Sequence, residues 1–134
     1  YCADITRTYP IDGRFTARQR EIYSLVLKAQ AAAIAAVKPG AYMHEVDGAA
    51  RAVFREAKMD DYYVHGIGHQ LGLDVHDSTP DGALVPGMVV TIEPGLYLPD
   101  EKIGVRIEDD ILVTASGNEN LSAKIPKQLS DIER

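Results

Sequence analysis

The sequence has one cysteine, Cys2, no tryptophan and only two phenylalanines among its 134 residues. A disulfide needs two cysteines, so an internal disulfide is excluded, and a structural zinc site built from several thiolates is excluded as well. No apolar run approaches the roughly 20 residues that a membrane-spanning helix requires. A secretory signal is also not visible, and we therefore expect a cytoplasmic protein that does not contact a membrane.

The chain also lacks an excess of basic residues. It carries 14 Lys and Arg against 20 Asp and Glu, for a formal net charge of −6. Because nucleic-acid binding depends on basic surfaces that displace counterions, this balance argues against a nucleic-acid partner. The length and the hydrophobic content of 46% are those of one ordinary globular domain. The sequence starts at Tyr1, without an initiator methionine, so we expect it to be part of a longer chain.

Two amphipathic helices are predicted in the first half. Thr16 and Gln19 have the spacing of a capping box, and apolar residues recur with helical spacing from Ile22 to Val37. Proline and glycine in Lys38 to Gly40 should end this helix. A second helix is predicted over Glu45 to Lys58, with five apolar residues on one face: Val46, Ala50, Val53, Phe54 and Ala57.

Strand signals dominate from Tyr62 onward. The segments Val89 to Leu98 and Gly104 to Thr114 are rich in β-branched residues and are bounded by Pro, Gly and Asp. We therefore expect one α+β domain, with no internal repeat or linker. The polar tail from Leu121 to Arg134 is expected to lie on the surface.

Three of the four histidines lie in VHGIGHQLGLDVHD, residues 64–77. Glycine in a strand weakens it and often marks a place where another group approaches the backbone closely. Three imidazoles spaced by glycines therefore suggest a site rather than a plain structural element. The pair His65 and His69 is also compatible with a purely structural cluster, and His44 is expected to be merely exposed at a helix start.

Acidic residues recur in the strand-like segments. Asp4 lies in ADITRT, Glu93 follows Val89, Val90 and Ile92, and Glu108 shares a strand face with Arg106. A carboxylate in an apolar strand is costly to bury unless a cation or strong donors compensate it. A metal is one such cation. Each acid also has a simpler interpretation: Asp4 as an ion pair with Arg7, and the glutamates as solvated strand residues.

Taken together, these motifs resemble a known family. HGIGHQLGLDVHD, TIEPGLY and GVRIEDDILVT, in this order, are similar to the metallopeptidases of the pita-bread (creatinase/aminopeptidase) fold, which include aminopeptidase P, prolidase and methionine aminopeptidase. DITRTYP at the start fits the same pattern, and the tail resembles the aminopeptidase P branch. The resemblance covers nearly the whole chain. It implies that residues 1–134 are the C-terminal portion of the catalytic domain, with the N-terminal side of the fold truncated.

The resemblance also implies a site. It assigns Asp4, His69, Glu93 and Glu108 as ligands of two divalent metal ions, with Mn²⁺ expected first and Co²⁺, Fe²⁺ or Zn²⁺ possible. Glu93 would also move a proton, and His65 and His76 would bind substrate. Arg106 would contact the metal-binding carboxylates without binding the metal itself. The family's first aspartate ligand would lie before Tyr1.

The implied activity is the removal of an N-terminal residue that precedes proline, by a full-length protein that is expected to form a homo-oligomer. Two alternatives stay open. A prolidase cuts Xaa-Pro dipeptides with the same motifs. A non-catalytic peptide-binding module of the same fold would be expected to have replaced several metal ligands. All four ligands that the resemblance assigns within residues 1–134 are present: Asp4, His69, Glu93 and Glu108.

Overall fold

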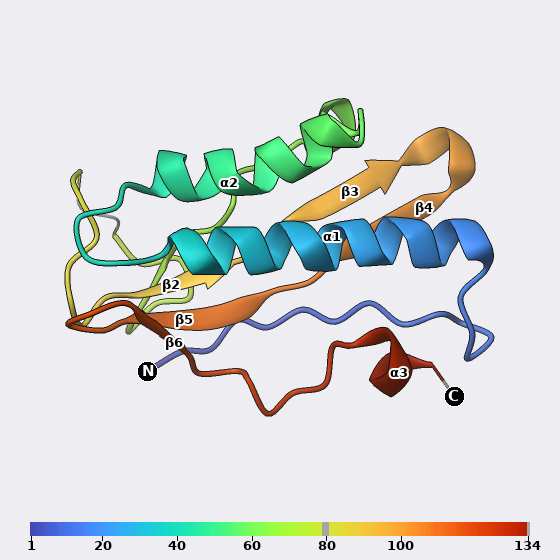
Figure 1. Cartoon of the computed structure of the whole chain (residues 1–134). Helices are drawn as coiled ribbons and strands as arrows, with labels where there is room; N and C mark the ends of the chain where they lie inside the picture. The colour runs from blue at the N-terminus through green and yellow to red at the C-terminus, as the bar shows by residue number, and fades with distance from the viewer. Residues whose placement is uncertain (79–80, 134) are drawn as a thin grey trace.

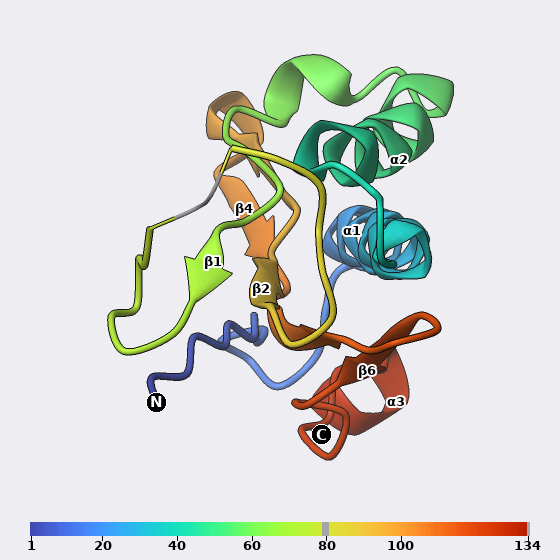
Figure 2. The same cartoon turned by 90° about the vertical axis from the view of Figure 1, so that its left-hand side faces the viewer.

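The computed structural model describes residues 1–78 and 81–133. Two long helices, α1 (Ala17–Ala36) and α2 (Met43–Glu56), pack side by side, and α1 packs against strands β2, β3 and β4 (Figures 1 and 2). The six strands are β1 (Gln70–Leu71), β2 (Val89–Ile92), β3 (Gly95–Leu98), β4 (Ile103–Arg106), β5 (Asp109–Val113) and β6 (Asn118–Asn120). A short helix α3 (Leu129–Ile132) follows them. This arrangement confirms the α+β class.

The helices form where the sequence predicts them. Thr16 and Gln19 make the reciprocal capping box, and α1 ends just before Lys38 to Gly40. The second helix begins two residues earlier than predicted, because the Glu45 carboxylate accepts the Tyr42 backbone N–H at 2.8 Å. It also ends earlier, since Lys58 adopts a left-handed backbone with φ of 57°. No helix in residues 1–78 and 81–133 is long and apolar enough to cross a membrane.

The two long predicted strands are each broken in the middle. The first divides into β2 and β3, and the second into β4 and β5, which gives one sheet of order β1-β2-β5-β6 and a separate pair β3-β4. All pairs are antiparallel, and the two breaks lie opposite each other: Ile92 pairs with Asp109, and Gly95 pairs with Arg106. Pro94 has no N–H to continue the ladder. Glu93 and Glu108 are therefore both located in the break.

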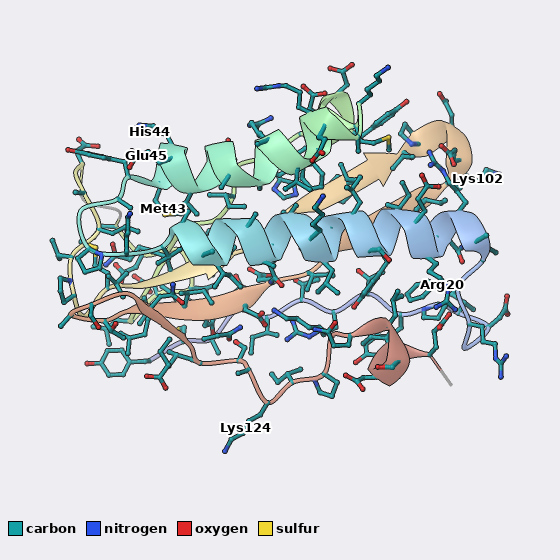
Figure 3. The ribbon with its side chains drawn as sticks, in the orientation of Figure 1. Arg20, Met43, His44, Glu45, Lys102 and Lys124 are labelled. Atoms are coloured by element: carbon teal, nitrogen blue, oxygen red, sulfur yellow. The ribbon has the colours of Figure 1, made fainter. Side chains whose placement is uncertain are left out.

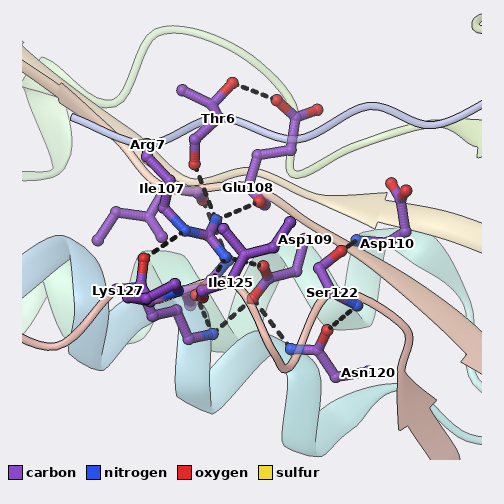
Figure 4. A network of polar contacts seen from close by, with 12 residues as sticks. Thr6, Arg7, Ile107, Glu108, Asp109, Asp110, Asn120, Ser122, Ile125 and Lys127 are labelled. Atoms are coloured by element: carbon purple, nitrogen blue, oxygen red, sulfur yellow. Dashed lines mark hydrogen bonds and ion pairs between the residues drawn. The ribbon is translucent and has the colours of Figure 1, made fainter. Parts of the chain in front are cut away.

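The C-terminal tail is not simply a surface segment, and this prediction was wrong in part. Ser122 and Ile132 are buried, and Lys127 reaches inward to the carboxylate of Asp109, which is fully buried on β5 (Figure 4). Lys124, in contrast, points away from the body of the protein (Figure 3). Arg134 lies outside the described residues. The tail is held because a buried carboxylate requires a compensating cation.

A second cation, Arg7, pairs with the same carboxylate at 2.7 Å. Burial acts to raise the pKa of Asp109, but hydrogen bonds from Lys127 and Arg7 outweigh it and hold the pKa below its ordinary value. Because this pKa is lowered on folding, the stabilisation is present at neutral pH and is lost as the pH falls through the folded-state pKa.

Replacing Arg7 should therefore destabilise the fold strongly. Removing one partner of a buried ion pair typically costs about 3–5 kcal/mol. Because Lys127 still pairs with Asp109, the loss of Arg7 should cost about 3 kcal/mol, at the lower end of this range. Arg7→Met should lower the free energy of unfolding by that order in urea titrations. Arg18→Met, which breaks the exposed pair with Glu101, is the control and should leave it nearly unchanged. Equal effects of the two substitutions would contradict the role of Arg7.

Candidate metal centre

The break between the two sheets places the side chains of Glu93 and Glu108 next to His69. The segment around His69 runs along β2: Thr91 N–H donates to the His69 carbonyl at 2.9 Å, and Glu93 N–H donates to the Ile67 carbonyl at 2.8 Å. This pairing brings His69 Nε2 to 3.5 Å from Glu93 Oε1. The histidine motif and the IEPG motif therefore meet because two antiparallel segments align them.

A contact of the His69 ring favours one of its two neutral tautomers. Nδ1 lies 3.1 Å from the Gln70 carbonyl. A carbonyl oxygen only accepts hydrogen bonds, so Nδ1 carries the proton in the neutral ring and Nε2 keeps its lone pair. This is the arrangement typical of a metal-binding histidine, in which the second nitrogen donates to a carbonyl or carboxylate.

Asp4 approaches from the N-terminal segment. Its Oδ2 lies 3.4 Å from His69 Nε2, and its backbone N–H donates to the Asp110 carboxylate at 3.3 Å. The segment is held against β5 by the bridge between Thr6 and Glu108. The simpler interpretation of Asp4, an ion pair with Arg7, is wrong, because Arg7 pairs with Asp109 instead.

These residues offer two overlapping sets of metal-binding atoms, both of which include His69. One set consists of Asp4, His69 and His76, and the other of His69, Glu93 and Glu108; in each set the ligand atoms lie within 4.8 Å of one another. Carboxylate oxygens with one imidazole are a hard donor set suited to divalent ions such as Mn²⁺. The residues present therefore fit a divalent metal ion.

The charge balance of the site also favours a cation. Glu108 is only 2% exposed. Burial raises its pKa, the hydrogen bond from Thr6 opposes this, and the nearby carboxylates of Glu93 and Asp4 raise it further. Three carboxylates in one partly buried site repel one another, and a divalent cation among them would remove that repulsion.

The other two histidines of the motif occupy different positions. His76 is exposed, and its ring stacks on the His69 ring with centroids 4.0 Å apart and an interplanar angle of 24°. His65 belongs to neither set of ligands found in the described residues; its Nε2 is 2.9 Å from the Tyr97 hydroxyl. His44 is exposed at the start of α2, as predicted (Figure 3).

Arg106 lies close to Glu108, although the strand that was predicted to carry both ends at Arg106. Its Nε donates to the Thr6 hydroxyl at 3.2 Å, and Thr6 in turn donates to the Glu108 carboxylate (Figure 4 shows Thr6 and Glu108). Arg106 Nε is 4.0 Å from Glu108 Oε2. The guanidinium therefore supports this carboxylate mainly through a hydroxyl.

Three residues of the site were missed from the sequence. The Thr6 and Thr91 hydroxyls donate to Glu108 and Glu93 respectively, and Asp110 accepts the Asp4 backbone N–H. A signal for them was available. Thr6 and Thr91 lie two residues from Asp4 and Glu93, and Asp110 lies two residues from Glu108, which is the strand period that puts side chains on one face.

Gly68 is required for the alignment of His69 with β2. A Cβ at this position would lie 1.8 Å from the Thr91 carbonyl oxygen, whereas a Cβ at Gly66 would meet nothing within 4 Å. Gly68→Ala should therefore separate the two segments, destabilise the fold by about 1–3 kcal/mol or more, and weaken metal binding. Thermal unfolding and metal titration would measure both effects. Gly66→Ala is the matched control, and an equal response to it would contradict the argument.

Comparison with known proteins assigns this geometry to a family. Residues 1–115 match the model of metallopeptidase family M24. The chain is 44% identical to Xaa-Pro aminopeptidase 1 of Streptomyces coelicolor, with 99% of this chain and 34% of the relative covered. It is 40% identical to the Xaa-Pro aminopeptidase of Escherichia coli, with 99% and 37% covered. The chain thus spans about a third of the length of these relatives.

Solved structures give the same result for the fold. The chain superposes on a putative aminopeptidase P from Bacillus anthracis with a TM-score of 0.91 and 43% identity, covering 96% of this chain and 34% of that one. The prolidase from Pyrococcus horikoshii gives a TM-score of 0.87 and 42% identity, covering 95% and 37%. These matches confirm the predicted pita-bread fold for the part that the chain contains.

Proposed function

This chain belongs to metallopeptidase family M24, and from that membership we propose that the protein carrying it is a Xaa-Pro aminopeptidase. It would remove the N-terminal residue of peptides that have proline at the second position. The observation that supports this most directly is the convergence of Asp4, His69, Glu93 and Glu108 at the sheet break. Relatives named Xaa-Pro aminopeptidase that align with nearly the whole chain support the substrate class.

The four residues would hold divalent metal ions, with Mn²⁺ as the first choice and Co²⁺, Fe²⁺ or Zn²⁺ as alternatives. Such ions, when bound, lower the pKa of a water molecule and polarise a carbonyl. The tautomer of His69 leaves Nε2 ready for this role, because the Gln70 carbonyl holds the ring proton on Nδ1.

Among the ligands, Glu93 is best placed to move a proton. Its Oε1 accepts a hydrogen bond from Thr91 at 3.2 Å, and Thr91 in turn accepts the His69 backbone N–H at 3.0 Å. This chain of contacts fixes the carboxylate beside His69. A carboxylate held in this way can accept a proton from an attacking water and pass it to the leaving amine.

The two other histidines of the motif, His65 and His76, would bind the substrate. His65 is oriented by Tyr97 and by the Gly66 carbonyl, which lies 2.8 Å from its Nδ1. His76 is exposed and stacks on the His69 ring, so it borders the site from the solvent side. An imidazole N–H of His76 can hydrogen-bond a peptide carbonyl, including one that becomes negatively charged. Both ring nitrogens of His65 already have partners, so His65 would bind a substrate by exchanging its contact with the Tyr97 hydroxyl.

Prolidase activity is the second candidate, and the superposition on the Pyrococcus horikoshii prolidase favours it specifically. The two activities share the residues described above and differ in the length of peptide accepted. The non-catalytic peptide-binding module stays a weaker alternative, because the ligand set within this chain is intact. Homo-oligomerisation, cytoplasmic location, the absence of nucleic-acid and membrane partners, and the assignment of residues 1–134 as the C-terminal portion of the catalytic domain stay predictions.

One experiment separates these candidates. The protein that carries this chain would be freed of metal, titrated with Mn²⁺ and assayed on an Xaa-Pro dipeptide and on longer peptides with proline second. Metal-dependent release of the first residue from the longer peptides is the expected result. Cleavage of the dipeptide alone would indicate a prolidase, and peptide binding without metal or hydrolysis would indicate the binding module.

A further inference from the structure

A polar side chain, Gln30, is fully buried in the middle of helix α1. The other buried residues of this helix are Ile22, Tyr23, Val26, Ala29 and Ala33, and Gln30 itself is 0% exposed. Burying an amide without partners costs several kcal/mol on the scale of transfer to an apolar solvent, so such a group is normally hydrogen-bonded. The partners of Gln30 therefore indicate why it is there.

Gln30 contacts both broken strands. Its Nε2 donates to the Ile92 carbonyl and to the Ile107 carbonyl, each at 3.2 Å, and its Oε1 accepts from Lys127 Nζ at 2.8 Å. The orientation of the amide follows from these partners. Carbonyl oxygens only accept and a lysine ammonium only donates, so the nitrogen must face the strands and the oxygen must face Lys127.

The two carbonyls belong to the peptide units that precede Glu93 and Glu108. A peptide unit is planar, so holding its oxygen and its N–H together fixes the orientation of the following Cα. Each unit is held at both ends. Gln30 binds the carbonyl oxygens, while the Glu93 N–H donates to the Ile67 carbonyl and the Glu108 N–H donates to the Thr6 carbonyl.

Ordinary strand pairing is interrupted at this place. The register of β2 with β5 ends at Ile92 and Asp109, and that of β3 with β4 resumes at Gly95 and Arg106. The Gln30 amide crosses the two strands inside this interruption. A side chain from the helix thus ties together two segments whose mutual spacing determines the distance between the two glutamates.

We propose that Gln30 is a positioning residue that sets the spacing of Glu93 and Glu108 for metal binding. The inference deepens the proposed function and rests on it for the metal. The hydrogen bonds of Gln30 go to Ile92, Ile107 and Lys127 and not to the metal-binding atoms, so it acts through the two peptide units. Lys127 assists by fixing the direction of the amide and is itself anchored on Asp109 at 2.5 Å (Figure 4).

The test compares Gln30→Met with Val26→Ala in the whole protein. Methionine keeps the length of the side chain but has no N–H. Val26→Ala removes buried methyl groups one turn earlier on α1 and leaves intact the two hydrogen bonds from Gln30 to the Ile92 and Ile107 carbonyls, here called the Gln30 clamp. Both should lower the melting temperature. Only Gln30→Met should weaken Mn²⁺ binding to the metal-free protein, by about 10–100-fold, the range found when groups that orient metal ligands are removed.

Amide hydrogen exchange of the metal-free protein gives a readout that does not depend on metal or activity. Peptides that contain residues 92–93 and 107–108 should exchange faster in Gln30→Met than in Val26→Ala at matched stability. Gln30→Glu provides a second variant, because a carboxylate keeps the contact with Lys127 while losing the donors to the strands. It should show the same two effects.

The outcomes are distinguishable. If the wild-type protein binds no Mn²⁺, the proposed function is wrong. The exchange measurement would still test whether Gln30 holds the two peptide units. If both Gln30 variants bind Mn²⁺ as tightly as the wild-type protein and exchange no faster than Val26→Ala, Gln30 is not a positioning residue. The proposed function would still stand.

Discussion

Glu93→Gln should abolish peptide hydrolysis by the protein that carries this chain while leaving its fold intact. Glutamine has nearly the same shape as glutamate, and its carbonyl oxygen can still accept the hydrogen bond from Thr91. The substitution removes the proposed proton acceptor, a group whose contribution is typically about 10²–10⁴-fold, and it also removes one negative charge from the proposed metal ligands. Both losses act on the same reaction, so the combined decrease should be at the upper end of this range or beyond it.

The measurement is the turnover of a peptide with proline second, together with the circular dichroism spectrum and melting temperature. Glu119→Gln is the matched control, since Glu119 is exposed on β6 away from the histidine motif. This variant should retain wild-type turnover. Near-normal hydrolysis by the Glu93→Gln protein would show that another group accepts the proton.

Local signals were sufficient to predict the two long helices, whereas the short helix α3 in the tail was not predicted. The capping box at Thr16 and the Pro-Gly pair after Val37 are contained within a few residues, and their outcome does not depend on the rest of the fold. The interruption of the strands was not predicted, because residues that favour strands stand on both sides of each break: Ile92 and Tyr97 flank the first, and Val105 and Ile111 flank the second. Only the opposed positions of Pro94 and Ile107 across the sheet, where a proline interrupts the ladder and Ile107 N–H donates to the Pro94 carbonyl at 3.4 Å, reveal it.

The site was predicted to the extent that its residues lie within recognisable motifs. Asp4, His69, Glu93 and Glu108 converge as expected, although their roles as metal ligands stay predictions. The supporting residues fall into two groups. Thr6, Thr91 and Asp110 follow the strand period and were within reach of the same reasoning.

Gln30 and Lys127 represent the second group. Gln30 lies 62 residues before Ile92, and Lys127 lies 18 residues after Asp109. A glutamine on a helix that also carries exposed charged residues, and a lysine in a polar tail, carry no local sign of a buried partner. Their contacts result from the packing of α1 and the tail against the strands, and tertiary packing of this kind is not encoded in any short window.

Replacing His76 should also have a large effect. The geometry allows two roles for this residue, metal ligand and substrate-binding group. Its ring stacks on His69, and with Asp4 and His69 it forms one of the two sets of atoms able to hold a metal. It is nevertheless exposed, whereas His69, Glu93 and Glu108 are partly or fully buried. A ligand inside the site is expected to be shielded from water, while a substrate-binding group has to face the space that the peptide enters.

We therefore expect His76→Ala to lower the specificity constant for a peptide with proline second by about 10²–10³-fold, the effect of losing one well-placed donor to a developing oxyanion. The metal content per chain, measured by elemental analysis, should equal that of the wild-type protein. His44→Ala is the control, because His44 is exposed on α2 and stacks only on Tyr42 among the aromatic contacts of the described residues. Loss of metal in the His76→Ala protein would instead show that His76 is a metal ligand. The site would then have two histidine ligands, His69 and His76, and only His65 would be left to bind the substrate.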